Sequence, residues 1–149
     1  MTLFILLVLA GCSKQMDSSQ VRQDAFDMLH HYHEAMERDG LLAEFEFLDD
    51  SPEFFWIPPG YMSALDYDSV KTILENNAPA ISSIQIKWEN LEVNALTSET
   101  ATFHGVVISA MTDTSGQVNS ARMLESGTLI RRTDGWKLLS GQTRLLSSE

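Results

Sequence analysis

The hydrophobic pattern of the chain changes period at Ile81, and this change restricts the folds that the chain can adopt. After Ile81 apolar and polar residues alternate, which is the two-residue period of half-buried strands. Turn sequences at 113–116 (DTSG) and 133–135 (TDG) divide the stretch. The sequence therefore predicts four long strands in an antiparallel meander, which begin at Ile81, Thr100, Val118 and Trp136 and end near Ala95, Thr112, Arg132 and Leu146.

The alternation in the first of these strands slips by one residue. Ile84, Ile86 and Trp88 share one face, and the apolar series resumes at Leu91 instead of at residue 90. One extra residue in a strand produces this change of register. The sequence therefore predicts a β-bulge near Glu89-Asn90.

The residues before Ile81 have a helical period. Apolar residues recur at spacings of three and four between residues 21 and 36, which predicts a helix of about five turns that Gly40 interrupts. Residues 41–48 predict a second short helix, although Phe45 and Phe47 also alternate as in a strand. The helical stripe consists of Val21, Ala25, Met28, Leu29, Tyr32 and Met36.

A short strand and a further helix complete the first half of the chain. The aromatic stretch 53–57 (EFFWI) predicts the strand, and Pro58-Pro59-Gly60 closes it. The helix starts at a cap, Asp66 or Ser69, and Pro79 ends it. Helices followed by a meander predict an α+β domain whose curved four-strand sheet, with one short strand added, packs against the helices.

The chain begins MTLFILLVLAGCSKQ, and its one cysteine follows the apolar run. Residues 3–10 are far fewer than the roughly 20 needed to span a bilayer, so the run predicts a secretory signal. The stretch Leu9-Ala10-Gly11-Cys12 resembles the lipobox of bacterial lipoproteins, although Met1 and Thr2 carry no basic side chain. The alternative is a frayed apolar terminus with an incidental cysteine.

The lipobox resemblance implies three segments. Residues 1–11 are the signal peptide, residues 12–20 are a polar tether, and residues 21–149 are one domain. Cys12 would be acylated and become the new N-terminus, so acyl chains would hold the protein on a membrane. The implied location is the cell envelope, and Ser13 favours the outer membrane facing the periplasm in a Gram-negative host.

Composition excludes several classes of function. The net charge is −11 and the isoelectric point is near 4.6, so the protein is not expected to bind nucleic acid. The sequence contains no glycine-rich phosphate loop, no CxxC pair and no GxSxG motif. No cofactor is therefore expected.

Three stretches together resemble the nuclear transport factor 2-like, or SnoaL-like, superfamily. They are HYHEAMERDGLLAEFEFLDDSPEFFWIPPG, SVKTILENNAPAISSIQIKWENLEV and SGTLIRRTDGWKLLSGQT, and they cover nearly all of the domain. The resemblance implies a cystatin-like cone with a pocket between the sheet and the helices. Members include isomerases, dehydratases, cyclases, small-ligand binders and dimerisation modules, so the fold alone does not give the function.

The last strand indicates which of these roles to expect. Several relatives have histidines after the tryptophan, whereas this chain has Ser140 and Gln142 after Trp136. Neither side chain titrates near neutral pH, so neither is a ready general base. We expect a pocket that binds a small apolar or ring-containing ligand or mediates a protein interaction, rather than catalysis. The predicted pocket residues are Trp56, Tyr61, Trp88, Ser140 and Gln142.

Titrating residues support a rival prediction, a small isomerase or hydrolyase that acts through His104 or a buried carboxylate. His104 lies in mid-strand, but an outward-facing histidine is the simpler expectation. Glu125 would be a base if buried, although a surface position opposite in face to Arg122 is more usual. The HHYH stretch places histidines 31 and 33 on the wetter faces of the helix, and no metal site is expected.

A third possibility is a purely structural homodimer through the outer sheet face. Leu139 and Leu145 have the strand parity opposite to that of Trp136 and Leu138. If the last strand alternates regularly, these two leucines give the sheet an apolar second face.

Overall fold

The computed structural model describes residues 17–146. The predicted signal peptide, Cys12 and the first part of the tether lie outside the described residues. No helix within 17–146 is long and apolar enough to cross a membrane.

Helix α1 (Ser18–Asp39) is the long helix predicted from the apolar stripe. The Asp17 carboxylate caps its start by accepting hydrogen bonds from the backbone N–H groups of Ser19 and Gln20. The helix ends at Gly40, whose φ of 88° suits glycine and whose N–H donates to the Met36 carbonyl. All six residues of the predicted stripe are buried.

The elements between α1 and the meander are short. The predicted second helix is a 3₁₀ helix, η1 (Leu41–Glu46), and the aromatic strand is β1 (Phe55–Ile57). Helix α2 (Tyr67–Asn77) begins at the predicted cap Asp66, whose side chain accepts from the Ser69 N–H. The 3₁₀ turn η2 (Ala78–Ala80), which contains Pro79, ends it.

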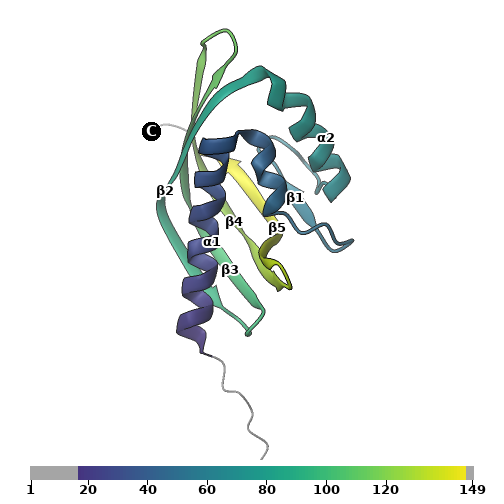
Figure 1. The fold of residues 1–149 in the computed structure, drawn as a ribbon, viewed down its shortest axis with the longest axis vertical. Helices are drawn as coiled ribbons and strands as arrows, with labels where there is room; N and C mark the ends of the chain where they lie inside the picture. The colour runs from purple at the N-terminus through teal and green to yellow at the C-terminus, as the bar shows by residue number, and fades with distance from the viewer. Residues whose placement is uncertain (1–16, 147–149) are drawn as a thin grey trace, which may run out of the picture.

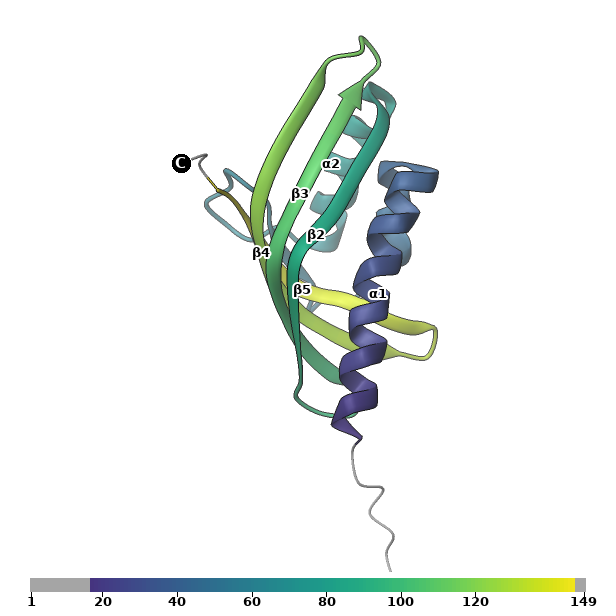
Figure 2. The same ribbon diagram turned by 90° about the vertical axis from the view of Figure 1, so that its left-hand side faces the viewer.

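Five strands form one sheet in the order β1-β5-β4-β3-β2. The four long strands are antiparallel neighbours, as predicted, and β1 pairs in parallel with β5. The sheet is strongly bent, and α1 lies along its concave side (Figures 1 and 2). The long strands are β2 (Ile81–Ala95), β3 (Thr100–Asp113), β4 (Val118–Arg132) and β5 (Gly135–Leu145).

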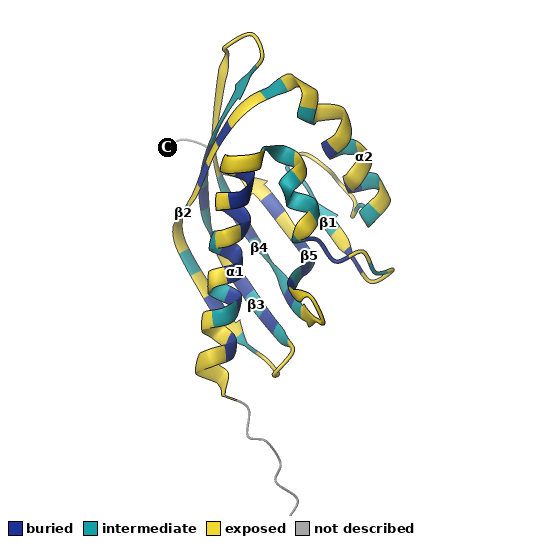
Figure 3. Ribbon diagram, in the orientation of Figure 1, coloured by how far each residue is buried: buried dark blue, intermediate teal, exposed yellow. Residues whose placement is uncertain are grey.

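The core lies between α1 and the concave face, which we call the inner face of the sheet. Buried residues follow the sheet-facing side of α1 and alternate along the strands (Figure 3). Trp136 and Leu138 are both buried in this core, as their shared parity predicted. The largest fully buried side chains are those of Leu29, Val107, Leu129 and Leu138.

Two β-bulges decide which residues reach the inner face. The first lies between Trp88 and Asn90, where the sequence predicted it. The second is in β5, where Leu138 pairs with Leu129 and Ser140 pairs with Thr128, so that Leu139 is the extra residue. After this bulge the parity reverses, and Gly141 and Thr143 are the buried residues. The prediction of regular alternation along this strand was therefore wrong.

Candidate functional site

The five residues predicted to line one pocket are divided between the two faces of the sheet. Trp56 and Trp88 lie on the inner face, where the indole N–H of Trp56 donates to the Thr143 hydroxyl at 3.2 Å. The Trp88 indole N–H points to the Leu29 carbonyl of α1, at 3.4 Å. Because of the bulge at Leu139, Ser140 and Gln142 face the opposite, outer side.

Tyr61 and Gln142 share a groove at the end of the sheet. Its volume is about 380 Å³, and its walls come from the loop after β1 and from β4 and β5. Tyr61 itself is 46% exposed. Leu124, Ser126 and Gln142 line this groove with outer-face parity, and Thr143 also lines it.

His104 lies on the outer face of β3. Its side chain is 53% exposed, and its Nε2 is 3.6 Å from a carboxylate oxygen of Glu92 on β2. An outward position was the simpler of the two sequence expectations. His104 is therefore on the face of the sheet opposite to the cone interior.

Glu125 occupies the inner face in the middle of β4. Gly105 of β3 and Thr143 of β5 are its direct neighbours across the sheet. The residue is only 7% exposed, and its Oε1 atom is buried with no hydrogen-bond partner among the described residues. The expectation that Glu125 is a surface carboxylate was wrong, because this residue shares the parity of the buried Leu129.

A second carboxyl group and a phenol accompany Glu125. Glu44 of η1 is partly buried, and Tyr32 of α1 is buried. Burial, together with the nearby charge of Glu44, raises the pKa of Glu125 to about 8. Burial also raises the pKa of Glu44 to about 7, although its interaction with the Tyr32 hydroxyl opposes that rise.

The phenol of Tyr32 is affected by the same surroundings. Burial, followed by the nearby charges of Glu44 and Glu125, holds its pKa well above the usual value. Tyr32 therefore stays protonated as a neutral hydrogen-bonding group. We call Tyr32, Glu44 and Glu125 the interior carboxyl site. The sequence indicated it only through the inner-face parity of Glu125 and the stripe position of Tyr32.

Aromatic rings stand on both sides of Glu125 because glycines leave room for them. A Cβ atom at Gly105 would lie 2.9 Å from the Trp88 ring, and one at Gly141 would lie 2.8 Å from Cη2 of Trp56 and closer still to its Cζ3. Each ring thus rests directly on the backbone of a neighbouring strand. Gly105 and Thr143 are the cross-strand neighbours of Glu125, so Trp88 and Trp56 lie over the strands on either side of it.

His33 of α1 packs against Trp88 on the inner face of the sheet. Its ring stacks on Trp88 with centroids 4.8 Å apart and an interplanar angle of 17°. His33 is buried, so the prediction of a wetter helix face was wrong for this residue, whereas His31 is exposed as expected. Burial, and then the nearby His30, lower the pKa of His33 to about 3.

Neither nitrogen of the His33 ring has a hydrogen-bond partner within the described chain. The described residues also contain no group of three or more His, Cys, Asp or Glu side chains placed to hold a metal ion. Its lowered pKa keeps the His33 ring neutral near pH 7.

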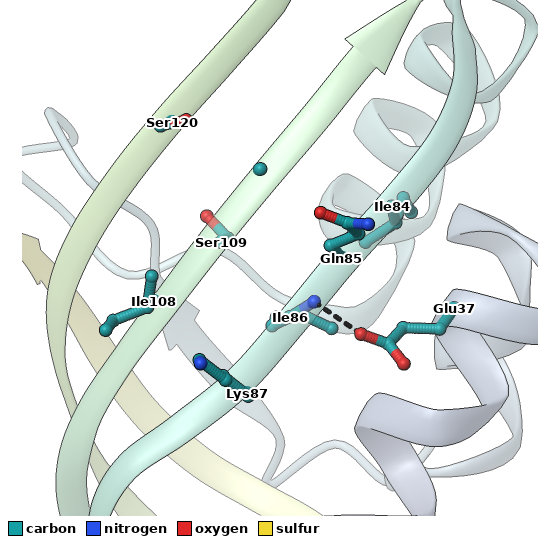
Figure 4. A pocket seen from close by; sticks show the side chains of 9 residues that line it. Glu37, Ile84, Gln85, Ile86, Lys87, Ile108, Ser109 and Ser120 are labelled. Carbon is teal, nitrogen blue, oxygen red and sulfur yellow. Dashed lines mark hydrogen bonds between the residues drawn. The ribbon is translucent and has the colours of Figure 1, made fainter.

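A larger hollow lies elsewhere on the sheet (Figure 4). It has a volume of about 570 Å³ and is lined by residues of β2, β3 and β4 and by Glu37 of α1. The Glu37 carboxylate accepts a hydrogen bond of 2.8 Å from the Ile86 N–H. None of the predicted site residues lines this hollow.

Comparison with solved structures identifies the architecture. A nuclear transport factor 2-like superfamily protein from Salmonella enterica superimposes with a TM-score of 0.72, at 13% identity over 87% of this chain and 94% of that one. A candidate dehydratase of the same family from Streptomyces avermitilis gives 0.73, at 16% identity over 87% and 99%. A cystatin-like protein from Caulobacter vibrioides gives 0.66, at 13% identity over 86% and 91%.

The chain has the cystatin-like α+β cone fold. This confirms the fold class predicted from the sequence, including the N-terminal helices over a curved antiparallel sheet. At these low identities the likeness concerns the fold alone. No protein-family model and no curated protein matches the chain.

Proposed function

We propose that the cone binds a small ring-containing ligand at the interior carboxyl site, between Trp56 and Trp88. The observation that carries this proposal is the buried Oε1 atom of Glu125, which has no hydrogen-bond partner among residues 17–146. Buried polar atoms are nearly always paired, and leaving one unpaired costs about 1–3 kcal/mol. A ligand with a hydrogen-bond donor would remove that cost and gain affinity from it.

The walls of the site suit a ring. Trp56 and Trp88 present large aromatic surfaces, and both are only partly buried, so part of each remains exposed to solvent. Glu44 is also partly buried, and Thr143 lines the groove of about 380 Å³.

Binding of small ring compounds to the purified protein tests this proposal through the tryptophan fluorescence. We expect Glu125→Leu, which removes the acceptor, to weaken binding by about tenfold, since one hydrogen bond contributes roughly 0.5–1.5 kcal/mol. Gln142→Ala on the outer face is the control and should bind as the wild type does. Saturable binding that Glu125→Leu leaves unchanged would place the ligand elsewhere.

Proton transfer is the second candidate function, and the raised pKa values of Glu44 and Glu125 favour it. A carboxyl group with a pKa of about 7 and another with a pKa of about 8 can serve as base and acid at neutral pH. One structural neighbour is a candidate dehydratase, which is compatible with an isomerase or hydrolyase. His104 would not take part in this proton transfer, because it lies on the outer face.

Turnover measurements separate the two candidates. If Glu125 is a general acid or base, Glu125→Gln should lower turnover by about 10²–10⁴-fold and leave ligand affinity nearly unchanged. His104→Ala is the matched control on the outer face. A ligand that binds saturably and gives no product supports the binding function instead.

We also propose, from the lipobox, that acylation at Cys12 anchors the domain to the cell envelope. Metabolic labelling with a fatty acid should mark the wild-type protein, and Cys12→Ala should abolish both labelling and membrane association. An unlabelled wild-type protein would contradict the anchor.

A homodimer through the outer sheet face is a separate proposal. The bulge at Leu139 gives Leu145 the parity of the inner-facing Thr143, so the prediction that these two leucines form an apolar outer face was wrong. Sedimentation velocity of the wild type and of Ile108→Glu, at an outer-face position of β3, tests the dimer. A wild type that sediments as a monomer would contradict it.

A further inference from the structure

We infer that the ligand of the interior carboxyl site is a small organic cation, an amine attached to an apolar ring. This inference rests on the proposed binding function and adds the chemical class of the ligand. It is carried by two carboxyl groups that have no cationic partner in the part of the chain that the structure describes, and by the Trp56 ring, over which no cation lies there.

The two carboxyl groups have no counter-charge within the described chain. None of the ion pairs among residues 17–146 includes Glu44 or Glu125. The third member of the site, Tyr32, is neutral. Elsewhere in the fold a buried carboxylate does receive a cation, because Asp49, which is only 3% exposed, accepts two hydrogen bonds from Arg132 at 2.7 and 2.8 Å. The interior carboxyl site lacks such a cation, and a bound amine would supply it.

The aromatic rings beside Glu125 offer a second attraction for a cation. A positive charge over the face of a tryptophan is attracted by the ring electrons. The fold already uses this contact once, where Arg131 lies 4.9 Å from the centre of the Trp136 ring. No such cation covers Trp56 or Trp88 within residues 17–146. His33 already stacks on Trp88, so Trp56 is the ring that offers a face to a cation. A carboxyl group next to such a ring is the combination that recognises an ammonium group.

Other ligand charges fit less well. An anion would meet two carboxyl groups and a protein of net charge −11. A neutral alcohol would donate one hydrogen bond to Glu125 and leave the charge of the site unbalanced. An amine donates several hydrogen bonds and balances the charge, while its ring contacts Trp56 and Trp88.

Proton release on binding gives a readout that a neutral ligand would not produce. The raised pKa values mean that the carboxyl groups are partly protonated near pH 7.5, and a bound cation would lower both values. The titratable groups that face Glu125 are Glu44 from η1 and Tyr32 from α1, and Tyr32 stays neutral throughout. Binding of an amine should therefore release protons into the buffer.

Calorimetric titration of the full protein with benzylamine and with benzyl alcohol tests the inference at pH 7.5 in two buffers of different ionisation heat. These probes share the ring and differ in charge. We expect benzylamine to bind at least tenfold more tightly and to release protons. Glu125→Gln should abolish that preference, and Glu44→Gln should reduce it. Glu92→Gln, which removes an exposed carboxylate from the outer face, is the control of equal charge and should keep the preference.

Each result decides one way or the other. If benzyl alcohol binds as tightly as benzylamine and Glu125→Gln weakens both, the amine inference is wrong and the binding function stands. If neither probe binds up to millimolar concentration, the inference and the proposed function both fail. If benzylamine keeps its advantage in Glu125→Gln, the preference comes from the surface charge, and the inference is overturned. Circular dichroism of both variants confirms that they are folded.

Discussion

The inner and outer faces of the sheet give titratable side chains different surroundings. His104 and Glu125 occupy the middle of neighbouring strands, only one position out of register. His104 points outward, is half exposed and has Glu92 beside it, whereas Glu125 points inward and has an unpaired oxygen. The strand parity of a titratable residue therefore decides its chemistry here, more than the type of residue does.

Two pairs of titratable residues lie on the outer face. Arg122 donates to Glu89 at 2.5 and 3.0 Å, and His104 lies beside Glu92. Exposed pairs of this kind contribute about 0–1 kcal/mol to stability. Large effects of substitution should therefore be confined to the inner face, and the predictions below test that difference.

The largest effect should come from removing the inner-face ring of Trp136. Trp136 is buried in the core beside Leu138, so Trp136→Ala leaves a large cavity. We expect a loss of about 3–5 kcal/mol in the free energy of unfolding. Urea denaturation measures it, with Trp136→Phe as the milder control. A loss under about 1 kcal/mol would show that this ring is not part of the core.

The next effect is a dependence of stability on pH. In the unfolded chain the carboxyl group of Glu125 titrates near about 4.3, whereas its pKa in the folded protein is about 8. Protonation therefore favours the folded state, and this contribution is complete below about pH 4 and lost as the pH rises through 8. The two pKa values differ by roughly 3.7 and one pKa unit corresponds to about 1.4 kcal/mol, so we expect a loss of up to about 5 kcal/mol over that interval.

Glu125→Gln should remove most of this pH dependence and stabilise the protein at pH 8. Denaturation curves at pH 5, 6.5 and 8 measure it, and Glu92→Gln on the outer face is the control that should follow the wild type. Parallel pH profiles of the wild type and Glu125→Gln would mean that Glu125 is solvated rather than buried.

A smaller effect should follow from filling the space over an inner-face glycine. A Cβ atom at Gly141 would meet the Trp56 ring and the carbonyl oxygen of Ser126, which belongs to the backbone and cannot easily move. We expect Gly141→Ala to cost about 1–3 kcal/mol and to move the Trp56 fluorescence. Ser140→Ala, one residue away on the outer face, should stay within about 0.5 kcal/mol. Equal effects of the two substitutions would refute the assignment of faces in β5.

The sequence predicted most of the fold because the apolar periods were clear. The stripe on α1, the bounds of the four long strands and the bulge near Glu89 all followed from the spacing of apolar residues. At Glu89 the bulge was visible because it interrupts a run of alternating apolar residues. At these places the spacing of apolar residues in the sequence matches the spacing of the buried side chains.

The candidate site was harder to predict because the second bulge, in β5, does not interrupt a run of alternating apolar residues. Around Leu139 the sequence reads Leu138-Leu139-Ser140-Gly141, and neither leucine shows which one is extra. The bulge moves Ser140 and Gln142 outward and brings Thr143 beside Glu125. Glu44 joins the site only because η1 brings it back toward α1, which is a tertiary effect. One inserted residue thus changed the predicted pocket.

The smallest effect should come from substituting His104, because this residue lies on the outer face of the sheet. The side chain is 53% exposed, and its neighbour Glu92 is 76% exposed, so solvent already screens both groups. We expect His104→Ala to change the free energy of unfolding by less than about 0.5 kcal/mol. Affinity for benzylamine should also match that of the wild type, because His104 lies across the sheet from Glu125. Calorimetric titration and urea denaturation of this variant check both values, with Glu125→Gln measured beside it. A tenfold loss of affinity in His104→Ala would mean that the ligand binds on the outer face, and the site would have to be sought there.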